Sequence, residues 1–199
     1  MKKIVMQGIF ATFIVLLCGC DDEQVKISTH TKDKSHLIEQ AENRDKSSYA
    51  GLEDVFLDTK HLYTQDADNK LTLFIFAKNN CLYCDKLKDD IANDNALKSM
   101  LQAHFLPDYI NTSYTKKHIL HKGEDTQTIP TFNLMEFYVK SPMRPTPTLV
   151  FVDREGKSIY ELPGYLPKDQ MLKLYTYMAN GAWKGKDEKQ IIMDINKEL

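Results

Sequence analysis

The sequence predicts an α/β fold with a central mixed sheet flanked by helices. An apolar run at 71–77 is rich in aromatic and β-branched residues, which is typical of a buried strand. Two helical patterns and a second strand follow it, in the order of a strand–helix–strand crossover. Later, two short apolar runs flank a turn that ends at Gly156 and predict an antiparallel hairpin. The expected strands are 71–77, 105–111, 149–152 and 157–162, and the expected helices are about 81–92, 96–104, 132–138 and 168–180.

The size and composition of the chain indicate one ordinary domain with extensions. It has 199 residues, of which 42% are hydrophobic, and a formal net charge of -2. The lysines are scattered, and no basic stripe with interleaved aromatic residues occurs along the sequence. The composition therefore gives no support to nucleic-acid binding, and we expect no nucleic-acid partner.

The N-terminal residues 1–19 resemble the signal peptide of a bacterial lipoprotein. Two lysines precede an apolar stretch at 4–17 that is too short for a comfortable membrane span. The stretch runs into Leu17-Cys-Gly-Cys20, where such a signal ends in a small residue and an obligatory cysteine. The resemblance implies a lipid on Cys20, with an ordinary secretory signal or a retained anchor as alternatives. Asp21 resembles the signal that keeps such proteins in the inner membrane.

The fold is expected to occupy residues 49–182, between a tether and a charged tail. Residues 20–48 are rich in Asp, Lys, Ser and Thr and have few large apolar groups, which predicts a lipidated flexible tether. The C-terminal residues 183–199 are strongly charged, with isoleucines on one side of a possible terminal helix.

Two segments of the expected domain have weaker patterns. Apolar residues at helix-like spacing predict a short helix at 49–63. The polar segment 112–128 is expected to be an insertion or long loop, with His118 and His121 on its surface.

The residues with the clearest chemistry are Cys81 and Cys84, at the start of the helix that follows the first strand. At a helix N-terminus, free backbone N–H groups and the helix dipole stabilise negative charge, so a thiolate forms more readily. The thiolate is the nucleophile of disulfide exchange, and a second cysteine one turn further on can resolve the mixed disulfide. We therefore assign Cys81 as the attacking thiol and Cys84 as the resolving thiol. If Cys18 leaves with the signal and Cys20 carries lipid, these two are the thiols that remain.

Two other uses of this cysteine pair are a static local disulfide and half of a metal site. Zinc takes four ligands, and the candidate ligands His118 and His121 follow only after a long separation. Asp85 stands where a c-type haem attachment motif requires histidine. We therefore expect neither a metal nor a cofactor.

Three motifs in this order resemble the thioredoxin superfamily over about residues 50–181. They are Cys81-Leu-Tyr-Cys84, Thr146-Pro147 and Pro163-Gly164-Tyr165. In that family the proline matched by Pro147 is cis and lies opposite the redox cysteines, so the resemblance implies that Thr146 and Pro147 bind an extended substrate strand. Tyr83 is a substrate contact or a plain surface residue of the helix. Within the superfamily, the sequence around these motifs is most similar to the periplasmic SoxW-like, thioredoxin-related proteins.

Two positions depart from the family pattern. Cytoplasmic thioredoxins have a buried aspartate six residues before the first cysteine and a tryptophan directly before it, where this chain has Ile75 and Asn80. Glu53, Asp85 or water are candidates for the proton-accepting role of the missing aspartate. The Leu-Tyr dipeptide between the cysteines matches neither thioredoxin nor the strong oxidants, so the sequence predicts no reduction potential.

The resemblance implies an enzyme, a thiol–disulfide oxidoreductase held by its lipid at the periplasmic face of the inner membrane. We expect it to reduce disulfides of envelope proteins and to be re-reduced by a membrane electron donor. The alternatives are an oxidase or isomerase of the same fold, and a non-catalytic binding lipoprotein in which the cysteines are structural.

Overall fold

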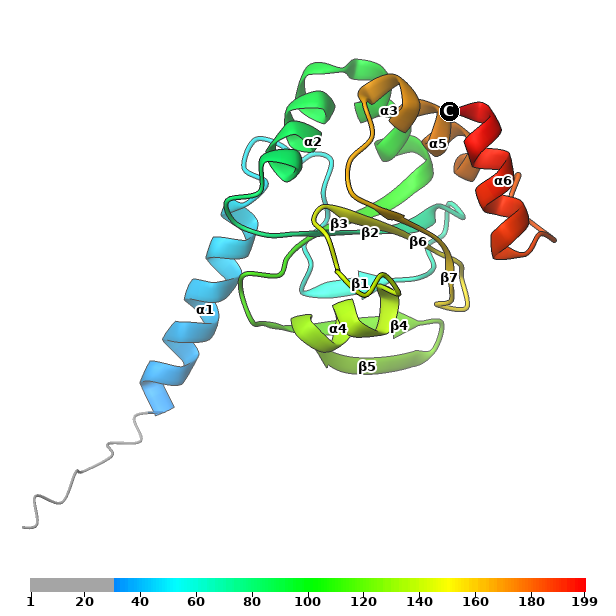
Figure 1. The fold of residues 1–199 in the computed structure, drawn as a ribbon. Coiled ribbons are helices and arrows are strands. Elements are labelled where there is room, and N and C mark those ends of the chain that lie inside the picture. Colours follow the sequence, from blue (N-terminus) through cyan, green and yellow to red (C-terminus); the bar gives the residue numbers. More distant parts are fainter. Residues whose placement is uncertain (1–30) are drawn as a thin grey trace, which may run out of the picture. The chain divides into compact units, whose positions relative to one another are not determined.

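A four-stranded mixed sheet forms the centre of the part of the chain that the computed structural model describes, residues 31–199 (Figure 1). Its strand order is β3-β2-β6-β7, with β2 parallel to β3 and antiparallel to β6. The hairpin of β6 and β7 is antiparallel, and the predicted mixed sheet is therefore confirmed. The four strands are β2 (Leu71–Ala77), β3 (Phe105–Asn111), β6 (Thr148–Val152) and β7 (Ser158–Pro163).

Helices cover one face of this sheet (Figure 1). Side chains alternate along a strand, so every second residue of β2, Ile75 among them, packs against these helices. Asp94 is the N-cap of α3, because its Oδ1 accepts two backbone N–H groups of the first turn at 2.9 and 3.1 Å. The helices are α2 (Leu82–Asn93), α3 (Asn95–His104), α5 (Lys168–Ala179) and α6 (Glu188–Glu198).

A second sheet, with one helix, covers the opposite face. Its strand order is β1-β4-β5, with β1 parallel and β5 antiparallel to β4. Phe74 and Phe76, the other alternate side chains of β2, pack here in one buried cluster with Leu120 and Tyr138. The elements are β1 (His61–Tyr63), β4 (Lys117–Lys122), β5 (Asp125–Pro130) and α4 (Thr131–Tyr138).

The polar segment 112–128 is therefore not the long loop that the sequence predicts. It contains β4 and most of β5, joined by a turn in which Gly123 has a φ of +60°. His118 and Leu120 are alternate residues of β4, and both are buried. Because one inward position is a histidine, the apolar alternation by which strands are recognised was hidden.

Residues 49–63 do not form the predicted helix. They run as a series of turns, with Gly51 at a φ of +86°, and end in β1. The backbone N–H of Leu57 donates to the carbonyl of Pro107 at 2.9 Å, so this segment covers the outer edge of β3. An edge strand tolerates a proline and is protected by such a cover, which explains why Pro107 does not interrupt β3.

Residues 1–30, which include the predicted signal peptide, Cys20 and the first part of the predicted tether, lie outside the described residues. The remainder of the predicted tether is not flexible coil, because Thr31–Ser47 form helix α1. The last turn of α1 buries Asp45 against the domain, and composition alone does not predict a single contact of this kind. Within 31–199, no helix combines the length and the apolar character that a membrane crossing requires.

The charged C-terminal tail is part of the folded domain. Helix α6 begins with a capping box between Asp187 and Gln190. It buries Ile191 and Ile195 in the same cluster as α5, whereas Ile192 remains partly exposed. The helix therefore packs along one side and presents its charges on the other.

Candidate redox site

Cys81 and Cys84 form a disulfide at the N-terminus of α2. Cys81 is the N-cap residue of the helix, and the backbone N–H of Cys84 donates to its sulfur at 3.2 Å. Cys81 is 6% exposed and Cys84 is 1% exposed, so the first sulfur is the more accessible one. That Cys81 is the attacking thiol stays a prediction.

The cysteine pair faces the turn at Thr146 and Pro147, whose peptide bond is cis, as the family resemblance implies. The sulfur of Cys81 lies 3.3 Å from the carbonyl oxygen of Thr146. The backbone N–H of Gly164 donates to the carbonyl of Pro147 at 2.8 Å. Gly164 has a φ of +99°, a conformation that favours glycine, so the third motif holds the second one in place.

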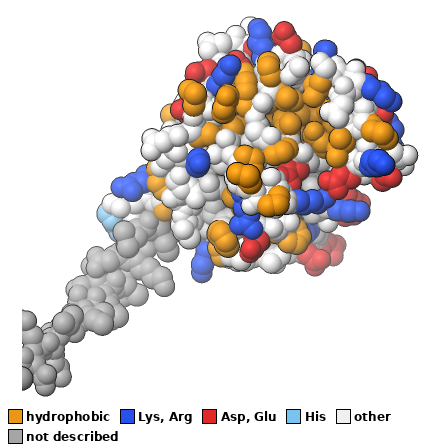
Figure 2. All heavy atoms as spheres, in the orientation of Figure 1, with side chains coloured by type: hydrophobic (Ala, Val, Ile, Leu, Met, Phe, Trp, Pro, Cys, Tyr) orange, Lys and Arg blue, Asp and Glu red, His pale blue; other side chains and the backbone are white. Residues whose placement is uncertain are grey.

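Tyr83 lies on the surface beside the disulfide and is 55% exposed. Its ring stacks on that of Tyr165, with centroids 5.9 Å apart, and Lys86 lies 5.0 Å from the same Tyr165 ring. Burial, with a hydrogen bond from its hydroxyl to Asp90, raises the pKa of Tyr165 to about 12. With exposed Leu82, these rings make an apolar rim, and Figure 2 shows hydrophobic side chains gathered over the helical half of the visible face.

The loop before Cys81 is held by amide hydrogen bonds. The side chain of Asn111 donates to Asn79 Oδ1 at 2.8 Å, and the backbone N–H of Asn79 donates to Ser113 at 2.9 Å. Asn80 has a φ of +54°, which asparagine adopts more readily than most residues. The residue that replaces the family tryptophan is therefore suited to a tight turn directly before the cysteine.

The lysines near the cysteine pair differ in their surroundings. Lys88 donates to the carbonyl of Ser48 at 2.9 Å and lies 3.1 Å from the Asp85 carboxylate. Its ammonium is therefore engaged away from the sulfurs, whereas Lys78 is exposed.

The buried carboxylate of thioredoxins has no equivalent at the expected place. Ile75 is fully buried there. The two proposed substitutes, Asp85 and Glu53, are both exposed. Asp85 forms an ion pair with Lys88, and Glu53 accepts a backbone N–H at 2.9 Å. Asp108 is fully buried, but it alternates with Tyr109 along β3 and points to the opposite face of the sheet. Water is the remaining candidate for the proton acceptor.

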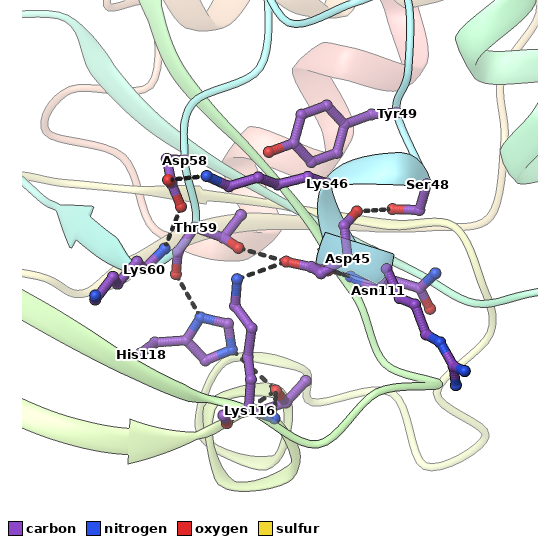
Figure 3. Close-up of polar contacts among 12 residues, drawn as sticks. Asp45, Lys46, Ser48, Tyr49, Asp58, Thr59, Lys60, Asn111, Lys116 and His118 are labelled. Carbon is purple, nitrogen blue, oxygen red and sulfur yellow. Dashed lines mark hydrogen bonds and ion pairs between the residues drawn. The ribbon is translucent and has the colours of Figure 1, made fainter. Parts of the chain in front are cut away.

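A buried polar network was missed by the sequence analysis (Figure 3). Asp45 Oδ2 lies 2.6 Å from Lys116 Nζ and accepts the hydroxyl of Thr59 at 2.6 Å. The imidazole of His118 donates through Nδ1 to the carbonyl of Thr59 at 2.6 Å, and its Nε2 lies 2.9 Å from the hydroxyl of Thr131. Burial lowers the pKa of His118, so this predicted surface residue is a neutral core group. No local pattern marks the network, because its members are far apart in sequence.

The two histidines considered as metal ligands have other partners. His118 belongs to the buried network, and His121 lies on β4 with its Nε2 3.0 Å from Nδ1 of His61. In the described part of the chain, no three His, Cys, Asp or Glu side chains come together as a possible metal site.

Comparisons with known proteins give the same fold. A family model described as a thioredoxin-like domain matches residues 60–179. A solved thioredoxin-fold protein from Helicobacter pylori is 35% identical over 77% of this chain and 95% of that one, with a TM-score of 0.70. A thioredoxin from Thermus thermophilus is 18% identical over 61% of this chain and 88% of that one, with a TM-score of 0.42. A disulfide isomerase from Xylella fastidiosa Temecula1 is 19% identical over 65% of this chain and 78% of that one, with a TM-score of 0.35. No functionally curated protein matches the sequence.

The family match includes the cysteine pair, the cis-proline turn and the glycine turn after the hairpin. Helix α1 and its Asp45 precede the matched residues. The similarity to SoxW-like proteins stays a prediction, because the comparisons identify the family and no subgroup of it. The fold, the cysteine pair and the match over more than half of the sequence place the chain in the thioredoxin-like family.

Proposed function

We propose that this protein is a thiol–disulfide oxidoreductase that reduces disulfides of bacterial envelope proteins. The observation that carries the proposal is the position of the Cys81 sulfur, which caps α2 and lies 3.3 Å from the carbonyl oxygen of Thr146. A sulfur held at a helix N-terminus and facing a cis-proline turn is placed for exchange with an incoming disulfide.

The proposed cycle uses the two sulfurs in turn. In the reduced protein the thiolate of Cys81 attacks one sulfur of a substrate disulfide, and the other substrate sulfur leaves as a thiolate. The thiolate of Cys84 then attacks Cys81, which releases the second substrate sulfur and forms the Cys81–Cys84 disulfide. Two electrons pass to the substrate. The N–H of Cys84, 3.2 Å from the Cys81 sulfur, and the helix dipole stabilise the attacking thiolate.

Substrate contacts are proposed on both sides of the Cys81 sulfur. The turn at Thr146 and Pro147 offers backbone to an extended segment that carries the substrate disulfide. The apolar rim of Leu82, Tyr83 and Tyr165 lies on the α2 side, and two of these side chains are more than half exposed. Tyr83 is therefore assigned as a substrate contact.

The location and the direction of electron flow belong to the same proposal. A lipid on Cys20 would hold the domain at the periplasmic face of the inner membrane, where a membrane electron donor reduces the disulfide again. The lipoprotein-like residues 1–20 support this location. The Cys20→Ser variant should lose incorporation of labelled fatty acid and should fractionate away from the membrane, whereas an unchanged distribution would contradict the anchor.

The reduction potential of the Cys81–Cys84 pair tests the direction. The protein is equilibrated in graded glutathione or dithiothreitol buffers, and its thiols are trapped by alkylation. A potential near about -270 mV, the value of thioredoxin, is expected for a reductase. A value near about -120 mV would indicate an oxidase, and no transition at all would favour the non-catalytic binder.

Trapping of mixed disulfides tests the enzyme class. The Cys84→Ser variant should accumulate envelope proteins bound to Cys81, because the resolving thiol is missing. Cys81→Ser is the matched control and should trap few, since Cys84 is 1% exposed. Equal recovery from both variants would contradict the assigned roles.

A further inference from the structure

The last turn of α1 is fixed to the domain by one buried carboxylate. Asp45 is 1% exposed and lies 2.6 Å from the ammonium of Lys116. It also accepts the hydroxyl of Thr59 at 2.6 Å and the backbone N–H of Asn111 at 3.1 Å. These four residues, Asp45, Thr59, Asn111 and Lys116, are called the α1 latch below (Figure 3).

The α1 latch is joined to the loop that carries the reactive cysteine. Asn111 is the last residue of β3, and its backbone N–H donates to the carboxylate of Asp45. Its side-chain amide donates to Asn79 Oδ1 at 2.8 Å. Asn79 lies two residues before Cys81. Thr112, which follows Asn111, donates both its backbone N–H and its hydroxyl to the carbonyl of Ala77, at 2.7 and 2.8 Å. The end of β3 therefore fixes the start and the middle of the short loop between β2 and Cys81.

A second contact joins the end of α1 to the redox helix itself. Lys88 of α2 donates to the carbonyl of Ser48, directly after α1, at 2.9 Å. The same ammonium lies 5.8 Å from the ring centroid of Tyr109, which packs against Tyr49. The chain at the end of α1 thus touches the loop before Cys81 through Asn111 and touches α2 through Lys88.

The charges of the α1 latch need an explanation beyond stability. Burying an ion pair removes two charges from water, so apolar residues of similar size often give equal or greater stability. The Asp45 carboxylate fixes the relative positions of three segments, because it contacts one donor group from each of them. Asp45 precedes residues 60–179, which match the thioredoxin-like domain, so the contact joins a segment outside the matched residues to the domain.

We propose that Asp45 is a positioning residue for the redox site, acting through Asn111 and Asn79 on the loop that presents Cys81. The inference depends on the proposed function, because it concerns the exchange chemistry of the same cysteine pair. Two thiols held in bonding geometry have a high effective concentration, and this favours the disulfide. A loosened loop lowers that concentration, so the disulfide becomes easier to reduce.

The test is the equilibrium of the full mature chain with glutathione, measured for Asp45→Asn beside the unaltered protein. We expect the equilibrium constant for forming the Cys81–Cys84 disulfide to fall at least threefold, which is about 15 mV toward less negative potential. Asp58→Asn is the matched control, because it makes the same change of charge at the exposed Lys46–Asp58 ion pair. The control should keep the potential of the unaltered protein.

Asp45→Asn leaves Lys116 buried without its carboxylate and so could fail to fold. The Asp45→Asn/Lys116→Gln variant removes both charges and makes the same test, with circular dichroism to establish folding. A folded Asp45 variant with the potential of the unaltered protein would overturn the inference. Failure of the unaltered protein to show any dithiol–disulfide transition would instead overturn the proposed function.

A double-mutant cycle with Asn79→Ala separates positioning from a general loss of structure. If Asp45 acts through Asn79, the Asp45 substitution should change the equilibrium constant little once Asn79 is alanine. Purely additive effects of the two substitutions would contradict the proposed route.

Discussion

The two faces of the central sheet are built from different kinds of side chain. The face covered by α2, α3, α5 and α6 has a mainly apolar core, with the Cys81–Cys84 disulfide at its rim. The opposite face, under the second sheet and α4, buries Asp108 and His118 together with its apolar cluster. The difference teaches that the proposed chemistry needs few buried polar groups near the cysteines, whereas the core under the second sheet contains two buried ionisable side chains.

The buried acid shows this difference most directly. On the helix-covered face, Ile75 occupies the position at which cytoplasmic thioredoxins have a buried aspartate. On the other face, Asp108 is fully buried and neither of its carboxylate oxygens has a hydrogen-bond partner. Burial raises the pKa of Asp108 well above its usual range, and the ammonium of Lys116 opposes this only in part.

The largest expected effect separates the chemistry of the two faces. Cys81→Ser should reduce disulfide exchange to the rate of the uncatalysed reaction, because the attacking thiolate is gone. Leu120→Ala, on the opposite face, should leave the rate per folded molecule unchanged. Insulin reduction coupled to dithiothreitol measures both rates. A large loss of rate in folded Leu120→Ala would show that the second sheet takes part in the chemistry.

The next prediction compares how much the buried clusters on the two faces of the sheet contribute to the free energy of unfolding. Leu87 of α2 and Leu120 of β4 are each buried to about the same degree, one on each face. Truncation of either to alanine should lower the free energy of unfolding by about 2–5 kcal/mol. Urea denaturation of both variants checks this. If 112–128 were a surface loop, Leu120→Ala would cost less than about 0.5 kcal/mol.

The sequence predicted the helix-covered face well and the other face poorly, for a physical reason. Strand β2 and helix α2 have undisturbed apolar periodicity, and the cysteine and Thr146-Pro147 motifs are local in sequence. Strand β4 alternates a histidine with a leucine at its inward positions, so its pattern resembles a polar loop. Asp45 finds Lys116 only in the folded chain, and no spacing rule connects them.

A moderate effect on the free energy of unfolding is expected from replacing Asp108, whose buried carboxylate has no hydrogen-bond partner. Asp108→Leu should raise the free energy of unfolding at pH 7 by about 1–3 kcal/mol, because a buried polar group without a partner is removed. The raised pKa means that the native state holds this proton at pH values where the unfolded chain has lost it. Stability contributed by protonated Asp108 is therefore present at low pH and lost as pH rises through the folded pKa. The gain from Asp108→Leu should thus be larger at pH 7 than at pH 4, measured by urea denaturation at both.

The smallest effect concerns His118, whose two ring nitrogens both have partners. Burial lowers its pKa below the usual 6.5, so the unfolded chain binds a proton at pH values where the native state does not. Stability from neutral His118 is present above pH 6.5 and is lost as pH falls through the folded pKa, with a slope of at most about 1.4 kcal/mol per pH unit. His118→Gln lacks this proton, so between pH 7 and pH 5 it should lose less stability than the unaltered protein. Equal losses for the two proteins would mean that His118 takes up its proton over the same pH range in the native and unfolded states, so that its burial does not lower its pKa.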